Sequence, residues 1–168
     1  MPNEYRTRPA GAGDDAFLRH MLHEAATWRP GIQKPPEAAV LMDDRLLRYV
    51  SGWGRPGDAG MIAMDKEGRR VGAAWFRLFS IDRPGYGFIE DSIPEISVAV
   101  RDDWRGQGIS TALLTSLLRE AATAEFQALS LSVSADNPAV RLYKRLGFVE
   151  VKLEEGSWTM RHDMRDSQ

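Results

Sequence analysis

The chain of 168 residues is long enough for one well-filled core, and we expect residues 1–168 to form a single domain. Its 22 basic and 24 acidic side chains are interspersed, so the net charge of −2 predicts neither a nucleic acid nor a membrane partner. The lack of cysteine excludes disulfides, thiolate metal sites and a covalent cysteine intermediate. A polar N-terminus and the absence of a run of about 18 apolar residues predict a cytoplasmic protein.

The first half of the chain predicts a strand, two helices and a hairpin. Asp14 can cap the first helix, whose apolar face carries Phe17, Leu18, Met21, Leu22 and Ala25. The expected ranges are 5–8 for the strand, about 37–50 for the second helix, and 61–65 and 71–79 for the hairpin. A loop that contains proline and glycine follows over residues 81–94.

The second half alternates strands and helices. The expected ranges are a strand at 95–100, a helix at 107–124, a strand at 129–134, a helix to about 146, and hairpin strands at 148–152 and 157–161. Asp136 or Asn137 can cap the second of these helices. The order β-α-α-β-β-β-α-β-α-β-β predicts an α/β fold with a mixed sheet covered by helices.

Two glycines precede the helix expected at 107–124, in the stretch Arg105-Gly-Gln-Gly108. Free N–H groups and the helix dipole make a helix N-terminus a site for an anion such as phosphate, and glycines let a ligand approach the backbone. A dinucleotide fingerprint would begin at the strand end and would have a third glycine, where Thr111 stands here. A P-loop would need a Gly-Lys pair. The alternative is a helix start whose glycines only permit a tight turn.

Two longer motifs carry a family resemblance. The segment 98–114, VAVRDDWRGQGISTALL, and the segment 137–148, NPAVRLYKRLGF, resemble the acetyl-CoA motif pair of the GNAT N-acetyltransferase superfamily. The family's R/Q-x-x-G-x-G/A pattern falls on Arg105, Gly108 and Ser110, so a serine replaces the usual last glycine or alanine. The resemblance implies a mixed, mostly antiparallel sheet of about six to seven strands, splayed at its centre and flanked by about four helices.

The resemblance also implies a donor site for acetyl-CoA as co-substrate, with no metal. The CoA pyrophosphate would lie on the backbone N–H groups of Arg105, Gly106, Gln107, Gly108, Ile109, Ser110 and Thr111. The pantetheine arm would run beside Val98, Ala99 and Val100, with Asn137 next to it, and a backbone N–H near Val98 or Ala99 could polarise the thioester carbonyl.

Two residues are candidates for catalysis. Tyr143 matches the family tyrosine that often protonates the leaving CoA thiolate, although its helical spacing is also that of a core residue. An amine with a pKa near 10 must lose a proton before it attacks, and Glu95 is our first choice of base. Glu90, Asp91 and water are the alternatives.

The resemblance therefore predicts an N-acetyltransferase that passes the acetyl group directly to a primary amine in a ternary complex. The acceptor would be a small molecule or a peptide, and a homodimer is left open. A non-catalytic acyl-CoA-binding or sensing module is the alternative, and a nucleotide-binding oxidoreductase is a weaker one. His20 and His23 lie three residues apart beside Glu24, but no H-E-x-x-H pattern supports a metal site.

Overall fold

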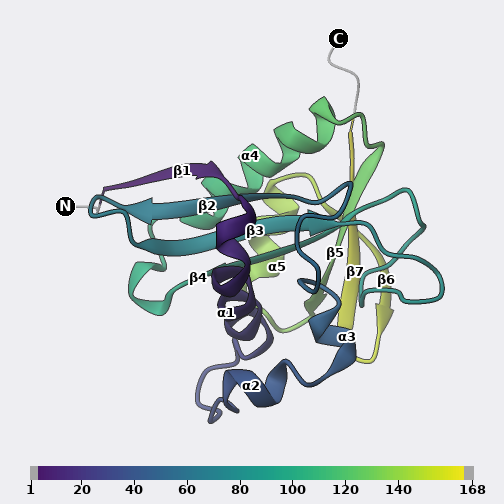
Figure 1. Ribbon diagram of the computed structural model, residues 1–168. Helices are drawn as coiled ribbons and strands as arrows, with labels where there is room; N and C mark the ends of the chain where they lie inside the picture. The colour runs from purple at the N-terminus through teal and green to yellow at the C-terminus, as the bar shows by residue number, and fades with distance from the viewer. Residues whose placement is uncertain (1–3, 165–168) are drawn as a thin grey trace.

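The computed structural model describes residues 4–164, which fold around one seven-stranded sheet. The strand order is β1-β2-β3-β4-β5-β7-β6 (Figure 1). The strands are β1 (Tyr5–Pro9), β2 (Ala59–Asp65), β3 (Arg70–Arg77), β4 (Glu95–Val100), β5 (Ala128–Ser134), β6 (Val149–Glu154) and β7 (Ser157–Asp163). Neighbouring strands are antiparallel except for β4 and β5, which are parallel, so the predicted mixed, mostly antiparallel sheet is confirmed.

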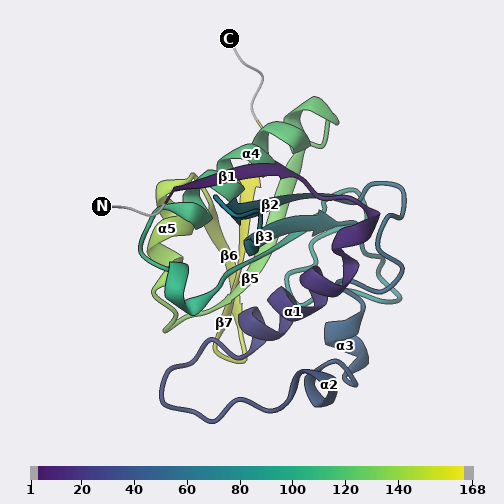
Figure 2. The same cartoon turned by 60° about the vertical axis from the view of Figure 1, so that its left-hand side comes forward.

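Helices cover both faces of the sheet. They are α1 (Asp15–Ala26), α2 (Glu37–Val40), α3 (Asp44–Leu47), α4 (Ile109–Thr123) and α5 (Ala139–Arg145). Figure 2 shows α4 and α5 on one side of the sheet, and α1 with α2 and α3 on the other. None of the helices in residues 4–164 is long and apolar enough to cross a membrane.

Each face of the sheet has its own apolar core. On one face Leu113, Leu114 and Leu117 of α4 are fully buried against β2, β3 and β5. On the other face Leu18 and Met21 of α1 are fully buried in the layer that α1 packs against β3 and β4. Burial of a leucine or methionine side chain contributes roughly 1.5–3 kcal/mol, so these two layers fix the sheet between the helices.

The prediction of one continuous helix over residues 37–50 is wrong. Residues 37–50 form two single turns, α2 and α3, because the Asp43 carboxylate accepts a hydrogen bond from the Arg45 N–H at 2.9 Å and starts a new turn. The apolar periodicity of this segment survives across the break, since Leu41, Leu46 and Leu47 still pack against the α1 side of the core.

The predicted cap of α1 is also only half right. Asp14 is the residue before α1, but its side chain makes no capping hydrogen bond. It pairs instead with Arg8 of β1 through two hydrogen bonds of 2.8 Å and accepts the Gly11 N–H at 2.7 Å. These partners lower the pKa of Asp14 to about 2, with the Arg8 hydrogen bonds as the largest cause. The carboxylate therefore ties β1 to the start of α1.

Candidate active site

The turn between β4 and α4 exposes a row of backbone N–H groups. Gly106 and Gly108 have φ of +78° and +79°, a left-handed conformation that favours glycine, and a Cβ at either position would meet no atom within 4 Å. Across residues 4–164 no acceptor is found for the backbone N–H groups of Gly106, Gly108, Ile109, Ser110 and Thr111. With the positive end of the α4 dipole, these amides form a site for an anion.

Arg105 and Ile109 hold this turn in place. The Arg105 Nε donates to the Val100 carbonyl at 3.2 Å, and its Nη1 lies 2.9 Å from the Asp102 carboxylate. Its Nη2 lies 3.8 Å from the Glu24 carboxylate on α1. Ile109, at the first position of α4, is 2% exposed and anchors the helix start in the core. The turn is thus fixed to β4, α1 and the core before any ligand binds.

Strands β4 and β5 meet at one end only. Glu95 is paired with Ser130, and the Ser130 N–H donates to the Pro94 carbonyl at 2.9 Å. Beyond this point no pairing between the two strands is found in residues 4–164. The predicted splay at the centre of the sheet is therefore confirmed, and residues of both strands border a cavity of about 940 Å³. Cavities of this size hold cofactors and small-molecule substrates.

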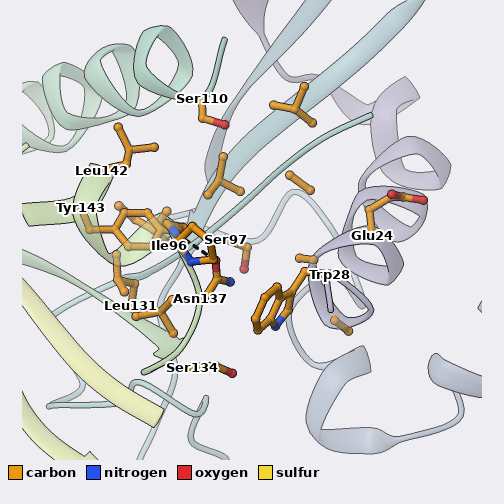
Figure 3. A pocket seen from close by; sticks show the side chains of 18 of the residues that line it. Glu24, Trp28, Ile96, Ser97, Ser110, Leu131, Ser134, Asn137, Leu142 and Tyr143 are labelled. Atoms are coloured by element: carbon orange, nitrogen blue, oxygen red, sulfur yellow. Dashed lines mark hydrogen bonds between the residues drawn. The ribbon is translucent and has the colours of Figure 1, made fainter. Parts of the chain in front are cut away.

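This cavity brings together almost all of the site residues that the sequence predicts. Gln107 lies half-buried in the glycine turn and does not border it. The predicted residues that border it are Glu95, Val98, Ala99, Val100, Arg105, Gly106, Gly108, Ile109, Ser110, Thr111, Asn137 and Tyr143. Figure 3 shows Tyr143 and Leu142 on one side of the cavity and Trp28 and Glu24 on the opposite side.

Asn137 starts helix α5 at the edge of the cavity. Its Oδ1 accepts the Ala139 N–H at 2.9 Å, which is the dashed contact beside Asn137 in Figure 3. Of the two predicted caps, Asn137 therefore fills the role, while the Asp136 carboxylate pairs with Arg29 at 2.5 Å. That ion pair joins the segment after α1 to the segment before α5, and both segments border the cavity.

Tyr143 lies at the meeting point of the core and the cavity. It is 8% exposed and packs edge-on against Phe148, with 6.0 Å between ring centroids, yet it also borders the cavity. Burial raises the pKa of Tyr143 to about 12, so the hydroxyl is protonated at neutral pH. In the described part of the chain the hydroxyl has no hydrogen-bond partner, which leaves its proton free for a bound molecule.

Glu95 is a buried carboxyl group at the closed end of the splay. It is 2% exposed, and burial raises its pKa to about 7. Hydrogen bonds from the Tyr49 hydroxyl and from the Gly87 N–H, the latter at 3.1 Å, act in the opposite direction and lower the pKa. A carboxylate with a pKa near neutrality suits a general base, because it both exists in the ionised form and binds a proton well.

Tyr49, which follows α3, is a site residue that sequence reasoning missed. Its hydroxyl donates to a carboxylate oxygen of Glu95 and accepts the Tyr86 N–H at 2.7 Å. Burial, followed by the charge of Glu95, raises the pKa of Tyr49 well above its usual value, so it stays a donor. Tyr49 and Glu95 are 46 residues apart, and no spacing rule connects them.

Two glycines in the loop at residues 81–94 are the sequence feature that could have indicated the contact between Tyr49, this loop and Glu95. A Cβ on Gly85 would overlap the Glu95 carboxylate and lie 2.7 Å from the Tyr49 hydroxyl. A Cβ on Gly87 would lie 2.6 Å from the carbonyl carbon of Leu131 in β5. The loop backbone can therefore reach Glu95 only because these positions lack side chains.

The other two candidate bases lie away from the cavity. Glu90 is exposed and accepts a hydrogen bond from the Gln127 Nε2 at 2.7 Å. Asp91 is exposed as well, and neither residue borders the cavity. Among the three carboxyl groups that the sequence offered, the geometry favours Glu95.

The histidines near Glu24 are engaged in local contacts. His20 lies 3.2 Å from the Glu37 carboxylate, and the His23 Nε2 lies 2.7 Å from the Pro35 carbonyl. Within residues 4–164 no group of three His, Cys, Asp or Glu side chains is arranged to hold a metal ion.

Comparison with known proteins agrees with this geometry. The model of the acetyltransferase (GNAT) family matches residues 19–148. This chain belongs to the GNAT family. A mycothiol acetyltransferase of Nocardiopsis dassonvillei is 34% identical over 85% of the chain and 42% of its own length, so the chain spans less than half of that relative. An N-alpha-acetyltransferase of Sulfurisphaera tokodaii is 44% identical over 34% of the chain and 36% of its own length.

A solved GNAT structure shares the whole fold. The phosphinothricin acetyltransferase of Sinorhizobium meliloti, solved in complex with acetyl-CoA, superposes with a TM-score of 0.66 at 21% identity. The match covers 95% of this chain and 88% of that one. The fold that the glycine turn, the splayed strands and α5 build here is therefore the GNAT fold.

Proposed function

We propose that this protein transfers the acetyl group of acetyl-CoA directly to a primary amine. The observation that carries the proposal is the shared cavity of about 940 Å³, which joins the glycine turn, the splayed strands, Tyr143 and Glu95. The anion site is supplied by backbone amides, and the groups that move protons are supplied by buried side chains. One cavity thus has a place for the donor and for the acceptor at the same time.

The donor is bound mainly by backbone groups. The N–H groups of Gly106, Gly108, Ile109, Ser110 and Thr111 receive the pyrophosphate of acetyl-CoA, whereas the Arg105 N–H, predicted to take part, already donates to the Asp102 carbonyl at 3.3 Å. Ser110 is small enough to let the pyrophosphate approach. The pantetheine arm forms hydrogen bonds with the unpaired edge of β4, as an additional strand would. A backbone N–H at Val98 or Ala99 then polarises the thioester carbonyl, and Asn137 borders the arm.

Two side chains carry the protons of the reaction. The Glu95 carboxylate accepts a proton from the ammonium form of the acceptor, directly or through one water, and leaves a neutral amine to attack the thioester carbon. As the carbon–sulfur bond breaks, the Tyr143 hydroxyl gives its proton to the CoA thiolate, and the proton that the nitrogen loses on forming the amide passes, directly or through water, to the Tyr143 phenolate. The products are the acetylated amine and CoA with a free thiol.

The acceptor side is lined by Trp28, Leu46 and Tyr86, which come from the segment after α1, from α3 and from the loop before β4. The named acetyltransferase relatives include one for mycothiol and one for N-alpha positions. A small-molecule or peptide primary amine therefore fits the proposal. The acceptor would contact apolar and aromatic side chains, and its amine would lie near the buried carboxylate of Glu95.

A panel of amines tests the proposal. Purified protein with acetyl-CoA is incubated with polyamines, amino acids, aminoglycosides and peptides, and the release of free thiol is followed. Acetyl-CoA-dependent thiol release with at least one amine class, and intersecting lines in a two-substrate initial-rate experiment, are expected for direct transfer in a ternary complex. Parallel lines would contradict direct transfer, and tight CoA binding without turnover on any amine would favour a sensing module.

A further inference from the structure

A second cavity, of about 390 Å³, lies between the segment after α3 and the end of β3. We call it the arginine cavity, and its polar lining residues are Arg48, Ser51, Arg55, Ser80 and Arg83. None of the residues that line it borders the larger cavity, so the two sites are separate. Its volume lies within the range of small-molecule sites.

The arginine cavity has an excess of positive charge. Arg48 and Arg83 share one carboxylate, Asp44, at 2.6 and 2.9 Å, and that side chain is 65% exposed. Behind the cavity lies Arg77, which is 1% exposed and pairs with Asp58 at 2.7 Å. With Arg55, four guanidinium groups are thus matched by two carboxylates, within a chain whose net charge is −2.

Arg55 is the least compensated of these groups. Its Nη2 donates to the Leu78 carbonyl at 3.0 Å, and within residues 4–164 its guanidinium makes no ion pair. Burial lowers the pKa of Arg55, and the charges of Arg77 and Arg83 lower it further, while the charge of Asp58 acts in the opposite direction. An anion placed between Arg55 and Arg83 would relieve this repulsion.

A neighbouring hydroxyl completes an anion-binding surface. The Ser80 Oγ accepts the Arg83 N–H at 3.3 Å, which leaves the hydroxyl proton free to donate. Ser51 borders the same cavity, and its backbone carbonyl accepts a hydrogen bond from Arg77 at 2.5 Å. Planar guanidinium groups bind phosphate and carboxylate oxygens with paired hydrogen bonds, and serine hydroxyls add single ones.

We propose that the arginine cavity binds a small, multiply charged anion that carries phosphate or carboxylate groups. The site does not depend on the proposed acetyl transfer, because it uses none of the residues of the larger cavity. It does share a segment with the acceptor side, since the Arg48 Nη1 donates to the Pro84 carbonyl at 2.8 Å, next to the glycine loop that contacts Glu95. Because the anion would bind the folded chain and not the unfolded chain, binding is expected to raise the melting temperature.

Calorimetric titration with inorganic pyrophosphate tests the proposal, with citrate as the carboxylate probe. Both titrations are run on the full chain, with and without saturating CoA, because the glycine turn is a second place where pyrophosphate could bind. We expect saturable binding of at least one probe that persists with CoA present. Arg55→Gln is expected to weaken it about tenfold, and increasing salt to weaken it further.

Two further variants make the outcome decisive. Arg83→Gln repeats the loss of charge at a side chain that is 60% exposed. Arg119→Gln is the matched control, since Arg119 is exposed on α4 and lies outside the cavity. Binding that CoA abolishes, or binding that is equal in the wild type, Arg55→Gln and Arg83→Gln, would overturn the proposal. Loss in Arg55→Gln and Arg83→Gln with no loss in Arg119→Gln would support it.

Discussion

The two halves of the large cavity are built from different parts of the chain and from different chemical groups. The half that we propose for the donor centres on one continuous turn, in which Gly106 and Gly108 present backbone N–H groups with open space in front of them. The half that we propose for the acceptor is assembled from side chains of remote segments, with Tyr49 and Glu95 joined by a buried hydrogen bond. The backbone amides carry fixed partial charges, whereas the carboxyl group of Glu95 can gain or lose a proton.

This difference separates what each half controls. Changes to the donor half should alter affinity for the donor and leave the pH dependence alone, because amides do not titrate. Changes to the acceptor half should alter turnover and its pH dependence, because Glu95 has a pKa of about 7. Variants in each half test whether affinity and pH dependence are controlled separately.

The largest expected effect is on the pH dependence of stability, through Glu95. The carboxyl ionises at an ordinary value of 4.5 but at about 7 in the fold, where burial disfavours its charge. The contribution of the protonated Glu95 to the free energy of unfolding is therefore fully present below pH 4.5 and is lost as the pH rises through 7. At about 1.4 kcal/mol per pH unit, the wild type should lose about 3 kcal/mol relative to Glu95→Gln between about pH 5 and pH 8.

Urea unfolding of both proteins at several pH values measures this difference. Titration of the histidines is common to the wild type and to Glu95→Gln, so it cancels when the two curves are subtracted. A difference in unfolding free energy that stays constant over the same pH range would mean that Glu95 ionises normally in the fold.

The next effect is on turnover, through Tyr143. Tyr143→Phe keeps the buried ring and removes a hydroxyl that has no partner in the described residues, so stability and acetyl-CoA affinity should change little. Turnover should fall by roughly 10²-fold, because the leaving thiolate loses its proton donor. Tyr5→Phe, on β1 and outside the cavity, is the matched control. Unaltered turnover in Tyr143→Phe would make this tyrosine a core residue only.

The smallest effect is a shift of the pH profile, through Tyr49. The Tyr49 hydrogen bond lowers the pKa of Glu95, so Tyr49→Phe should move the ascending limb of kcat/KM to higher pH. Donor affinity should not change, since Tyr49 lies in the acceptor half. The same Tyr5→Phe control applies. An identical limb in the wild type and in Tyr49→Phe would show that Tyr49 does not act on the base.

The geometry of the proposed donor half could be predicted from the sequence because its motifs are local. The glycine turn, the start of α4 and the cap at Asn137 lie within contiguous motifs, and the structure places them on one cavity. The splay between β4 and β5 was predicted from the family resemblance, and the single pairing of Glu95 with Ser130 confirms it.

The acceptor half and the arginine cavity could not be predicted in the same way. Tyr49 reaches Glu95 because residues 37–50 break into two turns at Asp43. The sequence pattern predicted a single helix over these residues and so did not predict this contact. Arg77 is a charged residue of β3 that tertiary packing buries against Asp58. Both contacts join segments that are far apart in the sequence, which periodicity cannot reveal.

Calorimetry of acetyl-CoA binding tests the central claim most directly, when it compares the wild type with Gly108→Asp and Gly156→Asp. Gly108 and Gly156 have φ of +79° and +81°, and a Cβ at either position would meet no atom within 4 Å, so both substitutions cost similar backbone strain, but only Gly108 borders the cavity. The wild type and Gly156→Asp should bind acetyl-CoA with micromolar-range affinity, and Gly108→Asp at least tenfold more weakly, about 1.4 kcal/mol. Equal affinity in all three, or no binding at millimolar acetyl-CoA, would contradict a donor site on the glycine turn.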